Sequence, residues 1–145
     1  MRVVGIDLGE RRIGVAVSDG TGTLATPRTT IERTGDDVAD WGAVAAVVKE
    51  VGARRVVVGM PLSLNGRRGP AARAAQADAD ALALTLASTG VAVETFDERL
   101  TTVSAARSLA DAGRRGRDQR ATIDQAAAAV LLQAWLDTHR GPSRA

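Results

Sequence analysis

The chain has 145 residues, of which 45% are apolar and 25% are charged, with a formal net charge of +2. These totals are typical of one globular domain, which we expect over residues 1–140, with a loose tail over 141–145. No apolar run approaches the roughly 18 residues of a membrane span, and the first residues resemble a strand rather than a signal peptide. Cysteine is absent, which excludes disulfides and thiolate chemistry and fits a cytoplasmic protein.

The positive charge is almost entirely arginine, since Lys49 is the only lysine. Six arginines lie between Arg99 and Arg120, against two acids, Asp111 and Asp118. Such a segment would suit binding to phosphates, although a general compositional bias towards arginine explains it equally well. Aromatic residues make up only 2% of the chain, so a nucleic-acid partner would be recognised by its backbone more than by base stacking.

Three apolar runs rich in β-branched residues open the chain, at Arg2–Leu8, Ile13–Asp19 and Leu24–Ile31. Short polar connectors separate them, and runs joined so closely can pair only as antiparallel neighbours. Pro27 lacks a backbone donor, which predicts that the third strand lies at a sheet edge or is bent there.

Helices and strands alternate in the rest of the chain. The first helix is predicted to open at Asp36 and Asp37 and to end at Gly52, with apolar residues at helical spacing between them: Val38, Trp41, Val44, Val48 and Val51. The patterns then predict a strand at 54–60, a loop at 61–70, a helix at 71–87 and a strand at 91–97. Two more helices are predicted near 103–112 and 122–138, with an arginine-rich loop at 113–120 between them. This order predicts an α/β fold. Its mixed five-stranded sheet has three antiparallel strands, then two parallel ones, and helices on both faces.

Asp7 is the single carboxylate in an otherwise apolar strand. Burying an ionised carboxylate is costly unless a cation or dedicated hydrogen bonds accompany it. The pattern therefore favours a metal ligand, and the alternative is an aspartate that caps the turn after the strand.

Three further acids are candidates for the same site. Asp97 and Glu98 end the fifth strand, and alternation lets at most one of them point in the direction of Asp7. Asp124 is predicted in the first turn of the last helix, where the helix dipole alone would favour an acid and where Thr122 is a natural N-cap. Together these acids suit Mg²⁺, with Mn²⁺ as an alternative. The only histidine, His139, is expected to be solvated.

Four motifs are similar to those of one known family. They are GIDLGERRIGVAVSD (Gly5–Asp19), VVVGMPLSLNG (Val56–Gly66), DERLTT (Asp97–Thr102) and IDQAAAAVLL (Ile123–Leu132), and in order and spacing they resemble the YqgF/RuvX family across essentially the whole chain. The family is described as pre-16S rRNA nucleases and as Holliday junction resolvases. The resemblance implies a ribonuclease H-like fold and metal-dependent phosphodiester hydrolysis.

The resemblance also implies roles for particular residues. Asp7, Glu98 and Asp124 become the catalytic metal ligands, so Glu98 is chosen over Asp97, which becomes a supporting residue. Arg99 is interpreted as a phosphate contact or an orienter of the acids, with a plain salt bridge as the alternative. The residues expected to contact nucleic acid are Arg12, Asn65, Arg67, Arg68, Arg114, Arg115, Arg117 and Arg120.

The favoured hypothesis is therefore a nuclease that processes the 5′ end of pre-16S rRNA in ribosome biogenesis. A Holliday junction resolvase is the alternative, and it would need a homodimer because two strands are cut symmetrically; the rRNA nuclease could be a monomer. A non-catalytic nucleic-acid-binding assembly factor is a further alternative. A phosphotransferase like the actin-like kinases is less favoured, because those clamp ATP between two such domains and this chain supplies one.

Overall fold

The computed structural model describes residues 1–61, 67–100 and 117–139 of the chain. Its strands are β1 (Arg2–Leu8), β2 (Arg12–Ser18), β3 (Ala25–Glu32), β4 (Ala53–Met60) and β5 (Ala92–Asp97); its helices are α1 (Asp37–Val51), α2 (Pro70–Leu86) and α4 (Arg117–Thr138), with short 3₁₀ turns η1 (Ala87–Thr89) and η2 (Glu98–Leu100). The helix predicted near 103–112, and the tail at 141–145, lie outside the described residues. No helix of the described part is long and apolar enough to cross a membrane.

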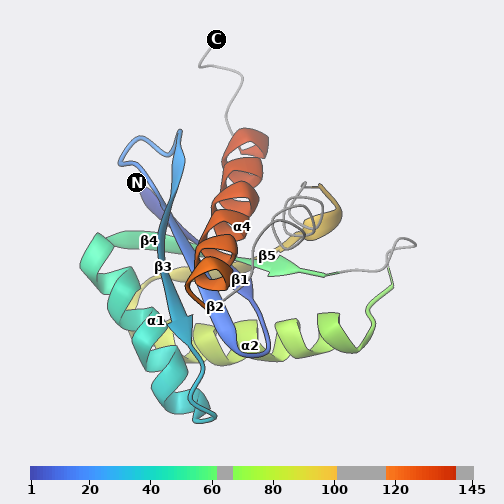
Figure 1. Ribbon diagram of the computed structural model, residues 1–145. Coiled ribbons are helices and arrows are strands. Elements are labelled where there is room, and N and C mark those ends of the chain that lie inside the picture. The colour runs from blue at the N-terminus through green and yellow to red at the C-terminus, as the bar shows by residue number, and fades with distance from the viewer. Residues whose placement is uncertain (62–66, 101–116, 140–145) are drawn as a thin grey trace.

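The five strands form one mixed sheet in the order β3-β2-β1-β4-β5 (Figure 1). β1 pairs antiparallel with β2, and β2 with β3, whereas β4 pairs parallel with β1 and β5 with β4. The predicted topology is therefore confirmed. Pro27 does lie on an edge strand, and the β2–β3 register shifts beside it, between Val15 and Ala16.

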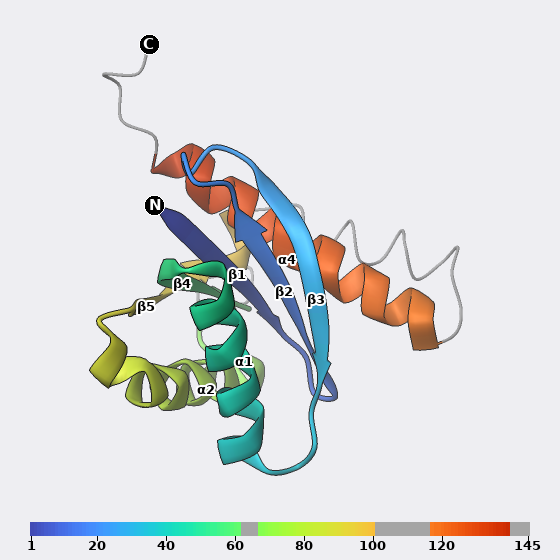
Figure 2. The same cartoon turned by 90° about the vertical axis from the view of Figure 1, so that its left-hand side faces the viewer.

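Helices cover both faces of the sheet (Figure 2). α1 and α2 pack on one face around a core that includes Ile6, Val15 and Leu82. α4 packs on the other face around Val3, Val57 and Leu131. α1 connects β3 to β4, and α2 connects β4 to β5, so both connections run in the same direction across the sheet. Because such crossovers are right-handed, both helices lie on the same face.

Helix α1 begins and ends where the sequence indicates. The side chain of Asp36 accepts hydrogen bonds from the backbone N–H groups of Val38 and Ala39, and Gly52 adopts the left-handed conformation that ends many helices. The predicted apolar face is wrong at Val38, which lies in the first turn of the helix and is 82% exposed. Asp40 is buried instead, and it accepts hydrogen bonds from the backbone and hydroxyl of Thr34.

The last helix starts earlier than predicted. α4 begins at Arg117 rather than near Thr122, so Thr122 is not its N-cap and Asp124 does not lie in its first turn. The arginines at 117 and 120 gave that stretch the appearance of a polar loop, but arginine is a good helix former. The helix-dipole explanation of Asp124 therefore loses its basis, because that effect is confined to the first turn.

The loop between β2 and β3 predicts a measurable pH effect. The carboxylate of Asp19 accepts hydrogen bonds from the backbone of Thr23 and Leu24 and the hydroxyl of Thr21, which lowers its pKa from 3.8 to about 2. Because the pKa of Asp19 is lower in the folded than in the unfolded chain, its carboxylate stabilises the folded state fully above pH 3.8. This contribution is lost as the pH falls through about 2. NMR titration of the carboxyl carbon should give a midpoint near 2; a midpoint near 3.8 would show that these hydrogen bonds do not persist.

Candidate metal and nucleic-acid site

Asp7 lies on the face of the sheet that α4 covers. Side chains alternate along a strand, so Val3, Gly5 and Asp7 share one face of β1. Val3 belongs to the core under α4, and a Cβ atom at Gly5 would lie 2.7 Å from the Cβ atom of Leu132 in α4. Asp7 is 3% exposed, so a carboxyl side chain is buried at the carboxyl end of the central strand.

Asp124 approaches Asp7 from the side of β2. Gly14 is the direct partner of Asp7 across the β1–β2 ladder, and paired residues of an antiparallel ladder share a face. A Cβ atom at Gly14 would lie 2.1 Å from the carbonyl oxygen of Asp124 and 3.2 Å from its Cβ atom. The backbone of α4 at Asp124 therefore rests directly on Gly14, which only the absence of a side chain allows.

Glu98 approaches from the opposite side, over β4. The β1–β4 register pairs Ile6 with Val58, so Gly59 is the next position of β4 beside Asp7. A Cβ atom at Gly59 would lie 2.6 Å from Oε1 of Glu98 and 3.2 Å from a methyl group of Leu131 in α4. The carboxylate of Glu98 thus lies over Gly59, on the α4 face of the sheet.

These contacts bring the three predicted acids to one face of the sheet. Asp7 occupies the centre, with Glu98 above the neighbouring strand on one side and Asp124 above the neighbouring strand on the other. Adjacent strands are about 4.8 Å apart, so the three residues lie near one another, and the carboxylate of Asp124 accepts a hydrogen bond from Arg12. Within the part of the chain that the structure describes, no three acidic or histidine side chains lie close enough together to coordinate one metal ion.

Arg12, predicted to contact nucleic acid, is paired with an acid of the site. Its Nε donates a hydrogen bond of 2.9 Å to Oδ2 of Asp124. Both side chains are about one-fifth exposed, at 20% and 19% respectively. Asp124 therefore already faces a positive charge, that of the guanidinium group.

Asp97 and Arg99 pair with each other. Nε of Arg99 donates to both carboxylate oxygens of Asp97, at 3.0 and 2.9 Å, and Nη2 donates to Oδ2 at 2.6 Å. These hydrogen bonds lower the pKa of Asp97 and raise that of Arg99. The salt bridge that the sequence left open for Arg99 is present, and the roles as a phosphate contact or as an orienter of the acids stay predictions.

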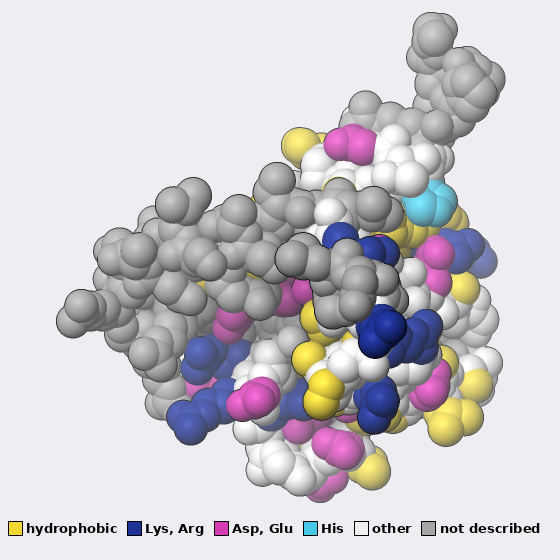
Figure 3. Space-filling model, turned by 90° about the vertical axis from the view of Figure 1, so that its right-hand side faces the viewer, with side chains coloured by type: hydrophobic (Ala, Val, Ile, Leu, Met, Phe, Trp, Pro, Cys, Tyr) yellow, Lys and Arg dark blue, Asp and Glu magenta, His cyan; other side chains and the backbone are white. Residues whose placement is uncertain are grey.

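Most of the residues predicted to contact nucleic acid lie outside the part of the chain whose side chains the structure describes. Asn65, Arg114 and Arg115 lie outside the described residues, and Arg117 and Arg120 are placed only as part of the backbone of α4. Arg67 and Arg68 are exposed just before α2, where Nη1 of Arg68 donates to the side chain of Gln76. On the face shown in Figure 3, the coloured basic side chains are interspersed with acidic ones.

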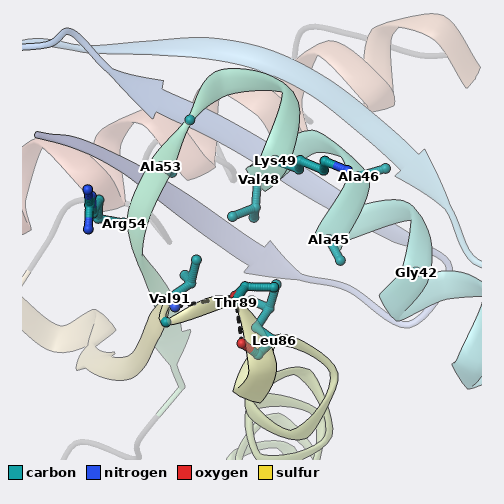
Figure 4. A pocket seen from close by; sticks show the side chains of 12 residues that line it. Gly42, Ala45, Ala46, Val48, Lys49, Ala53, Arg54, Leu86, Thr89 and Val91 are labelled. Carbon is teal, nitrogen blue, oxygen red and sulfur yellow. Dashed lines mark hydrogen bonds between the residues drawn. The ribbon is translucent and has the colours of Figure 1, made fainter.

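Other polar or hollow features lie away from the acids. His139 is exposed just after the end of α4, where its ring stacks on Trp135. It lies more than a dozen residues along the chain from Asp124. A pocket of about 530 Å³ lies between the ends of α1 and α2, lined by residues such as Ala45, Val48 and Leu86 (Figure 4). It is on the opposite face of the sheet from α4, so we do not assign it to the site.

Sequence reasoning missed Gly14 and Gly59, the two residues that let the flanking acids approach. A signal was present, because each is a glycine within a strand rich in β-branched residues, and such glycines often mark a close approach of another segment. The Arg12–Asp124 pair had no signal, since its members are 112 positions apart in the chain.

Comparison with known proteins agrees with this architecture. The sheet order and the two helical layers define a ribonuclease H-like fold, and the structure of Thermus thermophilus RuvC in complex with a Holliday junction substrate matches with a TM-score of 0.61 at 18% identity, covering 97% of this chain and 96% of that one. A second structure of T. thermophilus RuvC matches with a TM-score of 0.55, covering 95% of each chain.

The sequence identifies the family. The RuvX model, described as "Holliday junction resolvase", matches residues 1–138, and the chain belongs to this family. A protein of Myxococcus xanthus named "Putative pre-16S rRNA nuclease" is 49% identical over 142 residues, covering 98% of this chain and 91% of its own length. A Chloroflexus aggregans protein of the same name is 46% identical, covering 97% and 96%.

Proposed function

We propose that this chain is a metal-dependent nuclease that hydrolyses phosphodiester bonds of structured nucleic acid, with the precursor of 16S rRNA as its natural substrate. The observation that carries the proposal is that Asp7, Glu98 and Asp124 lie on the same face of the sheet, over neighbouring strands, at the carboxyl ends of the parallel strands. Ligands of open α/β sheets usually bind at this edge. The names of the full-length relatives supply the substrate.

The donor groups fit a hard divalent cation. All three candidate ligands are carboxylates, which suit Mg²⁺ or Mn²⁺ and not zinc. Asp7 is buried, as a ligand protected from bulk water should be, whereas Asp124 is paired with the guanidinium group of Arg12, which a cation would have to displace or bind beside. When bound, such an ion supplies Lewis-acid chemistry for phosphodiester hydrolysis.

The remaining polar residues would handle the substrate. Arg67 and Arg68 follow β4 and would bind phosphates beside the acids, together with the arginine-rich segment at 113–120. Glu98 rather than Asp97 would hold the cation, because the carboxylate of Glu98 lies over Gly59 beside Asp7. Asp97 would keep Arg99 in place, because its carboxylate accepts hydrogen bonds from that guanidinium group. A histidine general base is not part of the proposal, because His139 lies at the far end of α4.

The second candidate substrate is a four-way DNA junction. The family description favours it, and RuvC shares the fold. A resolvase cuts two strands related by a two-fold axis, so this activity would require a homodimer with two sites. Processing of one RNA end needs a single site.

A side-by-side digest tests the proposal. The protein is incubated with a pre-16S rRNA leader, a four-way DNA junction and linear duplex DNA, each with Mg²⁺, Mn²⁺ or EDTA. We expect cleavage of the rRNA leader that EDTA abolishes. Symmetric cleavage of the junction alone would favour the resolvase, while chelator-insensitive binding without cleavage of any substrate would leave a non-catalytic assembly factor.

A further inference from the structure

The ion pair between Arg12 and Asp124 joins distant parts of the chain at the proposed metal site. Arg12 is the first residue of β2, and Asp124 lies in α4, packed against Gly14 of the same strand. Because the backbone of Asp124 rests on Gly14, its side chain is held beside the strand that carries Arg12. The packing of α4 on β2 therefore positions the 2.9 Å hydrogen bond between Arg12 and Asp124. The pair differs in this from an ion pair between two exposed side chains that move independently.

This contact places a permanent positive charge, that of the Arg12 guanidinium group, beside the carboxylate of a proposed metal ligand. Arginine stays protonated at all ordinary pH values, so the guanidinium group cannot be neutralised to admit another cation. Side chains that are only 20% and 19% exposed are screened less than a fully solvated pair. A divalent ion at Asp124 must therefore either displace Arg12 or bind against its repulsion.

We propose that Arg12 is the internal counter-ion of Asp124 and competes with the divalent cation for that carboxylate, so that Arg12 sets how strongly the site takes up metal. The inference rests on the proposed function, because it takes Asp124 as a ligand. It goes beyond it in making Arg12 a regulator of metal affinity. The predicted role of Arg12 as a phosphate contact is replaced by one within the site.

Metal titrations of the full chain test this competition. Mg²⁺ and Mn²⁺ alone are titrated by calorimetry into the wild type, Arg12→Gln, Asp124→Asn and Arg28→Gln. Arg28 pairs with Glu50 in an exposed contact between β3 and α1, so its replacement removes the same charge away from the site. We expect Arg12→Gln to bind metal about tenfold more tightly, Arg28→Gln to match the wild type, and Asp124→Asn to lose most binding.

Each result has a distinct meaning. Unchanged or weaker metal binding in Arg12→Gln, with loss in Asp124→Asn, overturns the competition and leaves the proposed metal site intact. If the wild type and Asp124→Asn bind metal equally, or if neither they nor Arg12→Gln binds it, the metal site of the proposed function fails as well. Arg12→Met retains the apolar stem of the side chain and replaces Arg12→Gln if that variant unfolds. Metal should also raise the Tm of either Arg12 variant more than that of the wild type.

Discussion

Replacing Asp7 with asparagine is expected to abolish cleavage, with the single-turnover rate falling at least about 1,000-fold. Asparagine has nearly the same shape but no charge, so it should fit the buried position while removing the central of the three carboxylates. The loss should appear in cleavage of whichever substrate the wild type cuts. Nucleic-acid binding at fixed salt, circular dichroism and Tm should change little, because the proposed phosphate contacts are elsewhere.

Asp80→Asn is the matched control for this change. Asp80 is exposed on α2, on the opposite face of the sheet from α4, and its replacement removes the same charge by the same chemistry. It should cleave like the wild type. Full activity in Asp7→Asn, with Asp80→Asn equally active, would show that no catalytic metal depends on Asp7 and would remove the basis of the proposed function.

Gly14→Ala is expected to lower the free energy of unfolding by about 3 kcal/mol or more. The added Cβ atom would lie 2.1 Å from the carbonyl oxygen of Asp124, closer than any real contact. The obstacle is backbone, so β2 or the whole of α4 must shift, and α4 supplies most of the described core on that face of the sheet. Urea unfolding measures the loss. Cleavage should fall as well, because Asp124 moves with the helix.

Two other glycine replacements separate stability from activity. At Gly59 the new Cβ atom would lie 2.6 Å from Oε1 of Glu98, the end of a flexible side chain, so stability should fall less than in Gly14→Ala while cleavage is lost. At Gly20 nothing lies within 4 Å, so Gly20→Ala should stay within about 0.5 kcal/mol of the wild type and remain active. Equal unfolding midpoints for Gly14→Ala and Gly20→Ala would contradict the tight packing of α4 on β2.

The sheet could be predicted from the sequence because its information is local. Strand periodicity and short connectors fix the antiparallel meander, and the Asp36 cap and Gly52 bound α1. The start of α4 could not be read in this way, since its arginine-rich first turns have no apolar face to reveal them. The exposure of Val38 was missed because spacing along a helix does not tell how far the sheet beneath it extends.

The candidate site was predictable in its acids and not in their surroundings. Asp7 stands out as a charge in an apolar strand, and motif resemblance selected Glu98 and Asp124. Their relation to Gly14, Gly59 and Arg12 depends on the register of three strands and the height of one helix above them. These are tertiary quantities, which no spacing along the chain encodes.

The docking of α4 on Gly14 has a consequence for the newly made protein. Gly14 and Asp124 are 110 positions apart in the chain, so their contact can form only after both β2 and α4 have been synthesised. Contacts between segments so distant in sequence form slowly, because closing a long loop costs conformational entropy. The position of Asp124 beside β2 is therefore expected to be reached late in folding, after the antiparallel strands have paired.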